Sequence, residues 1–381
     1  MDMQTSSTVI LSQGSADSGT SLPGSLLRFN AIVWVAGLAV SLAVSIPAAL
    51  RYERSTTLTV RDGRLALDFE HFITREHPYR TPSLNAWTAA ELSLFQAGKP
   101  GLVVGSGGWL FSTEEFPLPS LRTRHVPANV ARMATMVKAL EQHGIRTVIL
   151  PIPAKADLYA EEVPGALRPH VLGMREVARE LDAAGLEWIP LAPAFEQAKA
   201  RGEQVFFRTE THWTPEGARL AAATTAAWIQ SRTQEEWPRR QFEVATGKPQ
   251  ALTGDLENYL PLAPHFAELL PPGETFTPYR FSSGSVSDDE GALFSDTANP
   301  VAVVGTSYSA DERWSYPGWL RVDLGTDIDN ISEKGKGPLV PMERFQKLVA
   351  AGKTGAKLVV WEMPVRTLAM DLSPQPRNGG H

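Results

Sequence analysis

The sequence predicts an α/β fold built on a parallel sheet and preceded by one membrane-spanning helix. Short, branched apolar runs alternate with amphipathic stretches along most of the chain, which is typical of strands and helices that alternate around a parallel sheet. A longer uncharged run stands near the N-terminus. The 381 residues are 43% hydrophobic, which is enough for the core of one large domain or two ordinary ones.

The N-terminal region changes character abruptly. Residues 1–28 are rich in Ser, Thr and Gly, so we expect a disordered tail. Residues 29–50 carry no charge and are numerous enough to cross a bilayer as a helix. We interpret them as a retained signal anchor; a buried core helix and a signal peptide cleaved near residues 46–49 are the alternatives. Arginines flank the run on both sides and leave its orientation undecided. Residues 51–66 are predicted to be a linker.

The main domain is predicted to cover residues 67–370, followed by a short tail at 371–381. Ligands bind beyond the carboxyl ends of the strands in parallel sheets, and both Ser307 and Lys155 closely follow predicted strands. The predicted strands are 102–104, 147–151, 186–190, 301–304 and 357–361, and the predicted helices are 129–143, 171–184 and 215–232.

Residues 233–300 break this alternation. They are rich in Pro, Gly, Ser and acidic residues, too irregular for a second domain and too long for a simple connection. We interpret them as an insertion or lid that faces the substrate. Gly254-Asp255-Leu256 within it has two interpretations, the positioning of a substrate hydroxyl and ordinary turn chemistry.

Two short segments supply the parts of an acyl-transfer triad. Glu210 and His212 are separated by one residue, so in an extended or turn conformation the carboxylate can reach one ring nitrogen and leave the other free. Ser307 lies far downstream. A serine is a poor nucleophile unless an adjacent base removes its proton, and that base works best when a carboxylate orients it. We therefore predict Ser307 as nucleophile, His212 as base and Glu210 as the orienting acid.

Several classes of function are disfavoured. The net charge of -6 argues against nucleic-acid binding, and the absence of cysteine excludes disulfides and thiolate chemistry. The glycines at 105–108 lack the lysine of a phosphate-binding loop. We therefore predict no nucleotide cofactor. We also predict no metal, because no metal-ligand spacing is present among the remaining histidines, including His125, His143, His170 and His265.

Five blocks, in order, resemble the signature blocks of the AlgX/AlgJ family of alginate O-acetyltransferases, and the similarity runs from about residue 67 to residue 368. This order is far more specific than any single block. The blocks are Gly105-Ser106-Gly107-Gly108-Trp109-Leu110-Phe111, Pro151-Ile152-Pro153-Ala154-Lys155, Glu210-Thr211-His212-Trp213-Thr214-Pro215, Gly305-Thr306-Ser307-Tyr308-Ser309 and Trp361-Glu362-Met363-Pro364.

The resemblance implies an SGNH-hydrolase-like three-layer α/β fold and a catalytic domain in the periplasm, held by an inner-membrane anchor. It implies transfer of acetyl groups onto hydroxyls of an exopolysaccharide such as alginate or cellulose, with a membrane-bound O-acyltransferase as the partner that supplies acetyl. The chain ends soon after the last block, so we expect the anchored single-domain branch, similar to AlgJ, without a carbohydrate-binding module.

One residue departs from the family pattern. The family usually has Asp two residues before the His, and this chain has Glu210. The Glu side chain is one methylene longer, so it can orient His212 only if its backbone lies slightly farther from the imidazole. We expect the change to be tolerated, since Ser-His-Glu triads occur in hydrolases. Four further residues are candidate substrate contacts, each with a structural alternative such as a solvated charge or core packing: Lys155, Trp213, Tyr308 and Arg313.

Two rival functions stay open at this point. The same residues could serve an acetyl esterase, because the choice between water and sugar depends on site dryness and acceptor affinity. A non-catalytic glycan-binding subunit of a polymer secretion complex is the second rival, with Glu210 as a sign of decay.

Overall fold

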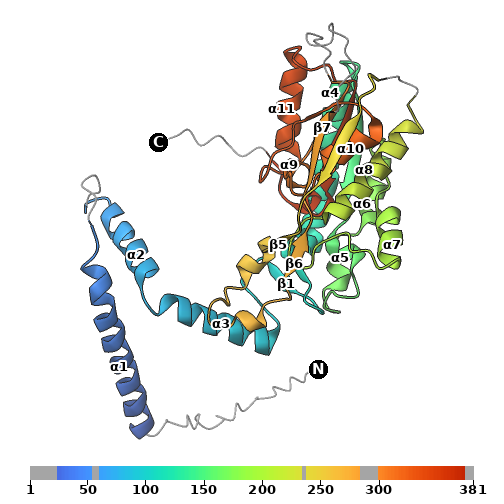
Figure 1. Ribbon diagram of the computed structural model, residues 1–381. Helices are drawn as coiled ribbons and strands as arrows, with labels where there is room; N and C mark the ends of the chain where they lie inside the picture. The colour runs from blue at the N-terminus through green and yellow to red at the C-terminus, as the bar shows by residue number, and fades with distance from the viewer. Residues whose placement is uncertain (1–23, 54–59, 234–236, 284–298, 374–381) are drawn as a thin grey trace, which may run out of the picture. The chain divides into compact units, whose positions relative to one another are not determined.

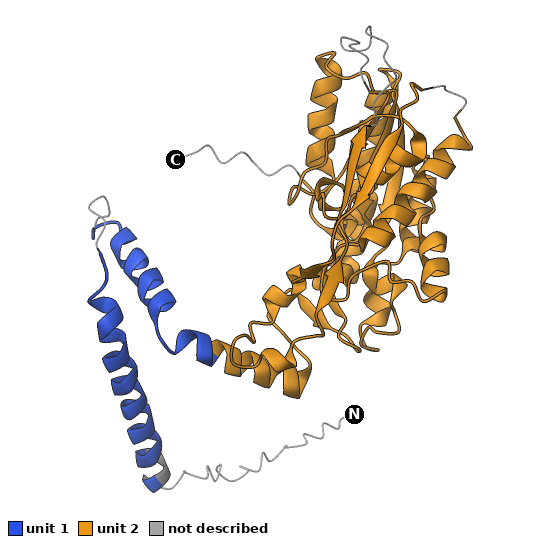
Figure 2. Ribbon diagram, viewed as in Figure 1, with its two compact units in different colours: residues 1–83 blue, residues 84–381 orange. Residues whose placement is uncertain are grey.

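The structure is a computed structural model that describes residues 24–53, 60–233, 237–283 and 299–373. The chain divides into two compact units, with the boundary between Ser83 and Leu84 inside helix α3 (Arg80–Phe95) (Figure 2). The first 23 residues and the end of the predicted C-terminal tail lie outside the described residues.

Unit 1 contains helix α1 (Gly24–Ala49) and helix α2 (Arg64–Glu76). An 18-residue window within Arg28–Ala49 has a mean hydropathy of 2.1, and 6% of that window is buried, which fits a helix that packs against lipid better than a core helix. The helix begins at Gly24, so residues 24–28 are helical and our prediction of a tail up to residue 28 is wrong there. Helix growth is cooperative, so the helix of the apolar run extends beyond the residues that carry the apolar pattern.

Unit 2 is centred on a four-stranded parallel sheet, which confirms the predicted parallel α/β class. The two middle strands are buried along their whole length, as expected when helices cover both faces. Leu358 of one middle strand lies opposite Val301 of the other. The strand order is β3 (Arg146–Ile152), β10 (Leu358–Pro364), β8 (Val301–Val304) and β9 (Ile328–Asn330).

Helices cover both faces of this sheet, so the predicted three layers are present. Successive residues of β8 point to opposite faces: Val301 and Val303 join one hydrophobic core, whereas Ala302 and Val304 join the other. Figure 1 shows α8 and α11 on opposite sides of the sheet. The first core is covered by α5 (Lys155–Leu158), α7 (Ala192–Ala200), α8 (Pro215–Gln230) and α10 (Tyr316–Leu324), the second by α4 (Pro119–Glu141), α6 (Met174–Ala183) and α11 (Leu339–Ala350).

Two predicted strands are not full strands of the main sheet. β1 (Leu102–Val104) pairs antiparallel with β2 (Leu110–Ser112), because the glycine-rich turn between them folds the chain back on itself. Residues 186–190 contribute one parallel bridge, between Trp188 and Ile149, and no named strand. An apolar run predicts burial, but it does not specify the pairing partner.

The predicted insertion at residues 233–300 is more regular than the sequence indicated. It forms two small antiparallel sheets, and residues 234–236 and 284–298 lie outside the described chain. These strands are short and mostly exposed, so they lack the apolar runs from which strands are predicted. The pairs are β4 (Phe242–Thr246) with β7 (Tyr279–Ser283), and β5 (Gln250–Leu252) with β6 (Glu274–Phe276).

Candidate active site

The Ser307 segment follows directly from strand β8. Gly305 and Thr306 connect the strand to the short helix α9 (Ser307–Ala310), and Thr306 is its N-cap, with a side chain that accepts from the Tyr308 N–H. A Cβ at Gly305 would lie 2.4 Å from the Glu362 carboxylate, so only glycine fits there. Ser307 thus stands at the carboxyl end of a middle strand, half-buried and within reach of a ligand.

The His212 segment is a tight loop in front of helix α8. The His212 carbonyl accepts from the Phe207 N–H at 3.3 Å, and the Val205 carbonyl accepts from the Thr214 N–H at 2.9 Å. Thr214 then caps α8 by accepting from the Gly217 N–H at 3.0 Å, with Pro215 as the first helical residue. Both ends of the loop are therefore held, and the imidazole is placed by fixed backbone.

The structure brings Ser307, His212 and Glu210 together. Ser307 Oγ lies 2.7 Å from His212 Nε2, and Glu210 Oε1 lies 2.6 Å from His212 Nδ1. With Nδ1–H donated to the carboxylate, Nε2 is free to accept the serine proton. His212 and Glu210 are both buried, so these contacts are only weakly screened by solvent.

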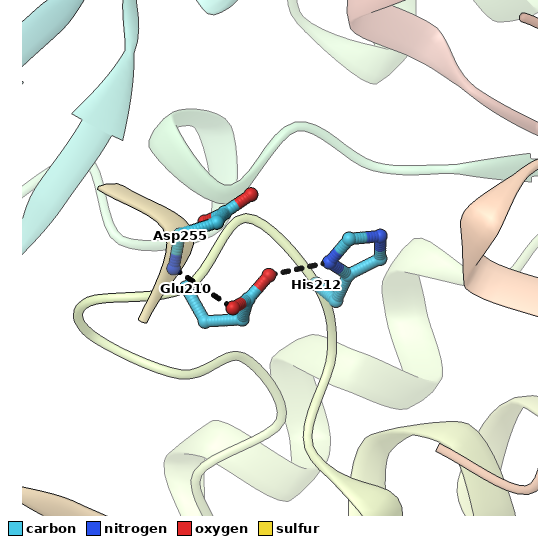
Figure 3. Close-up of side chains that lie close together, drawn as sticks. All are labelled: Glu210, His212 and Asp255. Atoms are coloured by element: carbon cyan, nitrogen blue, oxygen red, sulfur yellow. Dashed lines mark hydrogen bonds and ion pairs between the residues drawn. The ribbon is translucent and has the colours of Figure 1, made fainter. Parts of the chain in front are cut away.

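Asp255 supports this arrangement from the insertion. Its backbone N–H donates to Glu210 Oε2 at 2.9 Å (Figure 3). Its carboxylate accepts from the Thr211 N–H and hydroxyl at 2.8 and 2.6 Å. Both Glu210 oxygens are therefore occupied. Asp255 therefore supports the loop that carries the imidazole, a role that we did not predict, and the positioning of a substrate hydroxyl stays a prediction.

The ionisation of these two acids differs. Burial alone would raise the pKa of Glu210, but the hydrogen bond and charge of His212 outweigh it and lower the pKa. Burial and the neighbouring charge of Glu210 raise the pKa of Asp255. Ligand atoms of Glu210, His212 and Asp255 lie within 4.8 Å of one another, and hydrogen bonds within this cluster account for their proximity.

Lys155 is buried and does not lie where a substrate could contact it, in contrast to our prediction. It is 2% exposed, and its ammonium donates to three backbone carbonyls, those of Phe207, Arg208 and Glu210, at 3.2, 3.2 and 2.9 Å. Burial lowers its pKa to about 8. All three hydrogen bonds of the ammonium go to the loop that carries His212, so the prediction of a substrate-facing ammonium is wrong.

Trp213 and Tyr308 are also core residues. Trp213 is fully buried and packs edge-on against Tyr308, with ring centroids 5.2 Å apart. The Tyr308 hydroxyl donates to the Thr211 carbonyl at 2.5 Å and accepts from Arg366 Nη1 at 2.8 Å. The predicted substrate contacts through these two rings are corrected, because neither ring reaches the surface; Tyr308 instead joins the Ser307 segment to the His212 loop.

Arg313 is the one predicted substrate contact that remains exposed. Its guanidinium lies 4.5 Å from the centroid of the Trp314 ring and is paired with Asp311 at 2.8 Å. The Trp314 ring in turn lies 5.6 Å from the His212 ring, at an interplanar angle of 27°. Arg313 also lines a cavity of about 400 Å³ beside strands β4 and β7. A role in substrate binding stays a prediction.

Two further carboxylates hold these loops and were missed from the sequence. Glu274 of β6 accepts from the Thr209 N–H and hydroxyl at 2.9 and 3.0 Å. Glu362 of β10 accepts from the Thr306 N–H at 2.8 Å. Glu362 lies in the last of the five family blocks, whereas the irregular composition around Glu274 gave no signal.

Comparisons with known proteins decide the family. Residues 102–365 match the family described as SGNH hydrolase-like domain, acetyltransferase AlgX. The chain belongs to the AlgX/AlgJ family. It is 38% identical to the probable alginate O-acetylase AlgJ of Azotobacter vinelandii over 89% of this chain and 88% of the relative. The AlgJ of Pseudomonas aeruginosa is 35% identical over 91% of both chains.

Solved structures agree with this membership. The O-acetyltransferase domain of Pseudomonas putida AlgJ matches with a TM-score of 0.63 and 35% identity, over 73% of this chain and 96% of that chain. Pseudomonas aeruginosa AlgX shares the fold, with a TM-score of 0.51 and 22% identity. The AlgX of Pseudomonas fluorescens is matched over 56% of its length, whereas the AlgJ relatives are matched almost end to end. The chain is thus closer to AlgJ than to AlgX, as predicted.

Proposed function

We propose that this protein is an O-acetyltransferase that moves an acetyl group through Ser307 onto hydroxyls of an exopolysaccharide, with alginate as the first candidate. The observation that carries the proposal is the continuous contact from Ser307 Oγ through the His212 ring to Glu210, at 2.7 and 2.6 Å. The membership of the AlgX/AlgJ family and the AlgJ relatives named as alginate O-acetylases support the reaction type and the acceptor.

In the first step, His212 Nε2 takes the Ser307 proton while the serine oxygen attacks the carbonyl carbon of an acetyl ester. The tetrahedral intermediate collapses to acetyl-Ser307, and the donor's alcohol leaves with the proton from His212. Glu210 stabilises the imidazolium that forms in between. As the first residue of α9, Ser307 has a backbone N–H that the helix does not use, and this N–H can donate to the developing oxyanion.

In the second step, a sugar hydroxyl replaces the donor. His212 Nε2 removes its proton, the sugar oxygen attacks the acetyl carbon, and collapse returns the proton to Ser307 Oγ as the acetylated sugar leaves. The balance between sugar and water as acceptor depends on how well the acceptor excludes water from the half-buried serine. The two activities therefore share all three side chains.

We also propose where the protein works and what it works with. The apolar segment Arg28–Ala49 supports attachment to the inner membrane, with unit 2 in the periplasm where an exported polymer passes. A membrane-bound O-acyltransferase would then supply the acetyl donor at the membrane surface, and the anchor would keep the two proteins near each other. The AlgX relatives, named as alginate biosynthesis proteins, are consistent with such a machinery.

The test is an assay with an acetyl ester donor in the presence and absence of an alginate oligosaccharide. We expect acetylated oligosaccharide from the wild-type protein and none from Ser307→Ala, with the fold of the variant unchanged by circular dichroism. Hydrolysis at the same rate with and without oligosaccharide, and no acetylated product, would identify an esterase instead. Product formation by Ser307→Ala would refute the role of Ser307.

A further inference from the structure

One buried ionisable group beside the nucleophile takes no part in the proposed mechanism. Glu362 lies in the middle strand β10 and is 0% exposed. A carboxylate is costly to bury unless hydrogen bonds compensate for the lost water. Its neighbours along β10 are apolar, including Val360, Trp361 and Met363, so the core itself has no need of a charge at this point.

All the hydrogen-bond partners that the Glu362 carboxylate has among the described residues belong to the segment that carries Ser307. Its carboxylate accepts from the Thr306 N–H at 2.8 Å, from the Thr306 hydroxyl at 2.9 Å and from the Ser309 hydroxyl at 3.0 Å. These residues stand on either side of Ser307 in the sequence. The contacts therefore bracket the nucleophile without touching its side chain.

Through Thr306, the Glu362 carboxylate also affects the first turn of helix α9. Because the Thr306 hydroxyl gives its proton to Glu362, its lone pairs point to the Tyr308 N–H, from which it accepts at 3.4 Å. Gly305 allows the carboxylate to approach the backbone closely, since a Cβ there would lie 2.4 Å from Glu362 Oε2. Strand β10 thus holds the start of α9 through three donors and one tight packing contact.

We propose that Glu362 is a positioning residue, which holds the Thr306–Ser309 turn so that the Ser307 hydroxyl points at His212 Nε2. This inference rests on the proposed function, because it assumes that Ser307 is the nucleophile. A displacement of the reacting atoms by about 1 Å is enough to lower a rate about a hundredfold. The rate of attack by Ser307 should therefore depend on Glu362 even though Glu362 meets no substrate.

The decisive variant is Glu362→Gln, which keeps the volume but has one acceptor oxygen where the turn offers several donors. We expect a folded protein whose kcat for a small acetyl ester falls at least about tenfold, while KM changes by less than about twofold. Sulfonylation of Ser307 by a phenylmethanesulfonyl reagent, followed by mass spectrometry, should slow by the same factor. A folded variant with wild-type kcat and wild-type labelling would overturn the proposal.

Two further variants keep the test informative. Asn129→Ala removes two hydrogen bonds, to the Leu368 and Met370 carbonyls, away from the turn; it should lower stability and leave kcat per folded molecule unchanged. Ser309→Ala removes one Glu362 contact from the other side and should slow labelling about threefold or more. If Glu362→Gln does not fold, normal labelling of Ser309→Ala would overturn the proposal.

Ser307→Ala, measured in parallel, separates this inference from the proposed function. If Ser307→Ala retains acetyl transfer, the proposed function fails, whatever the result at Glu362. If Ser307→Ala is inactive and Glu362→Gln is folded and as fast as the wild type, the proposed function stands and the role of Glu362 is refuted.

Discussion

At the scale of single residues, Glu210 shows how a longer acid is accommodated beside the histidine. One oxygen reaches His212 Nδ1 at 2.6 Å, and the other accepts from the Asp255 N–H at 2.9 Å. The insertion thus supplies a backbone anchor for the side chain. Since burial and hydrogen bonding restrict its motion, Glu210 can orient the imidazole in the way that an aspartate orients it in related triads.

Glu210→Gln should therefore inactivate the enzyme without unfolding it. A neutral amide can donate to Nδ1 and stabilise the wrong tautomer of His212, so we expect kcat to fall by about 10³-fold or more. The measurement is kcat for an acetyl ester, with Glu203→Gln as a control that removes an exposed acid paired with Arg201. Full activity of Glu210→Gln would mean that His212 needs no partner.

The ionisation of Glu362 gives a prediction for stability. Burial raises its pKa from 4.5 to about 7, and the ionisable groups that face it are Arg366, Tyr308 and Tyr316. Between these two values the Glu362 carboxyl binds more protons in the folded state than in the unfolded state, so its contribution to stability is fully present below pH 4.5 and is lost as the pH rises to about 7.

Denaturant titrations of the wild type and Glu362→Gln at several pH values would measure this effect. The difference in unfolding free energy between the two proteins should change by about 3 kcal/mol, against the wild type, as the pH rises across this interval. A difference that is independent of pH would show that the pKa of Glu362 in the folded protein is not raised.

At the scale of elements, the site is made by loops that buried side chains join to one another. Lys155, at the start of α5, holds three carbonyls of the His212 loop. The Tyr308 hydroxyl of α9 donates to the Thr211 carbonyl of the same loop. The strands place the loops at one edge of the sheet, and these contacts then set the distance between nucleophile and base.

Lys155→Met should separate a positioning role from substrate binding. Methionine fills much of the same volume but offers no donor to the loop, so we expect kcat to fall about tenfold with little change in KM. Lys199→Met, which removes a lysine from α7, is the control and should leave both constants unchanged. A higher KM with unchanged kcat would contradict the positioning role of Lys155.

The sequence predicted an element best where burial alone determined the pattern of residues. The strand at 301–304 was predicted with the observed bounds, because a short branched apolar run that stops at a glycine is typical of a buried strand. The partner of residues 102–104 could not be predicted, since pairing depends on the turn that follows. The supporting acids Glu274 and Glu362 were missed, because a carboxylate in the sequence gives no sign of burial until its donors are known.

At the scale of the whole molecule, the chain combines an apolar helix with a compact α/β unit that contains every residue of the candidate site. The described residues of unit 1 contribute no side chain to the contacts among Glu210, His212 and Ser307. Ester chemistry and attachment to the membrane should therefore be separable.

A chain that starts at Pro78, and so keeps helix α3 whole, should test this separation. We expect it to be found in the soluble fraction and to cleave a small acetyl ester at a rate within about threefold of the full chain. Acetylation of polymer in cells should be lost, because the shortened chain lacks the segment proposed to export it and to hold it beside the donor partner at the membrane. If the truncated protein still acetylates polymer in cells, the anchor has no role in the reaction.

Mass spectrometry of the protein after brief reaction with an acetyl ester donor, quenched in acid, tests the central claim most directly. We predict one added acetyl group on the peptide that contains Ser307, its loss on addition of the oligosaccharide acceptor, and no acetyl group on Ser307→Ala. An acetyl group carried by another residue at the same rate in Ser307→Ala, with acetylated oligosaccharide still formed, would contradict the account.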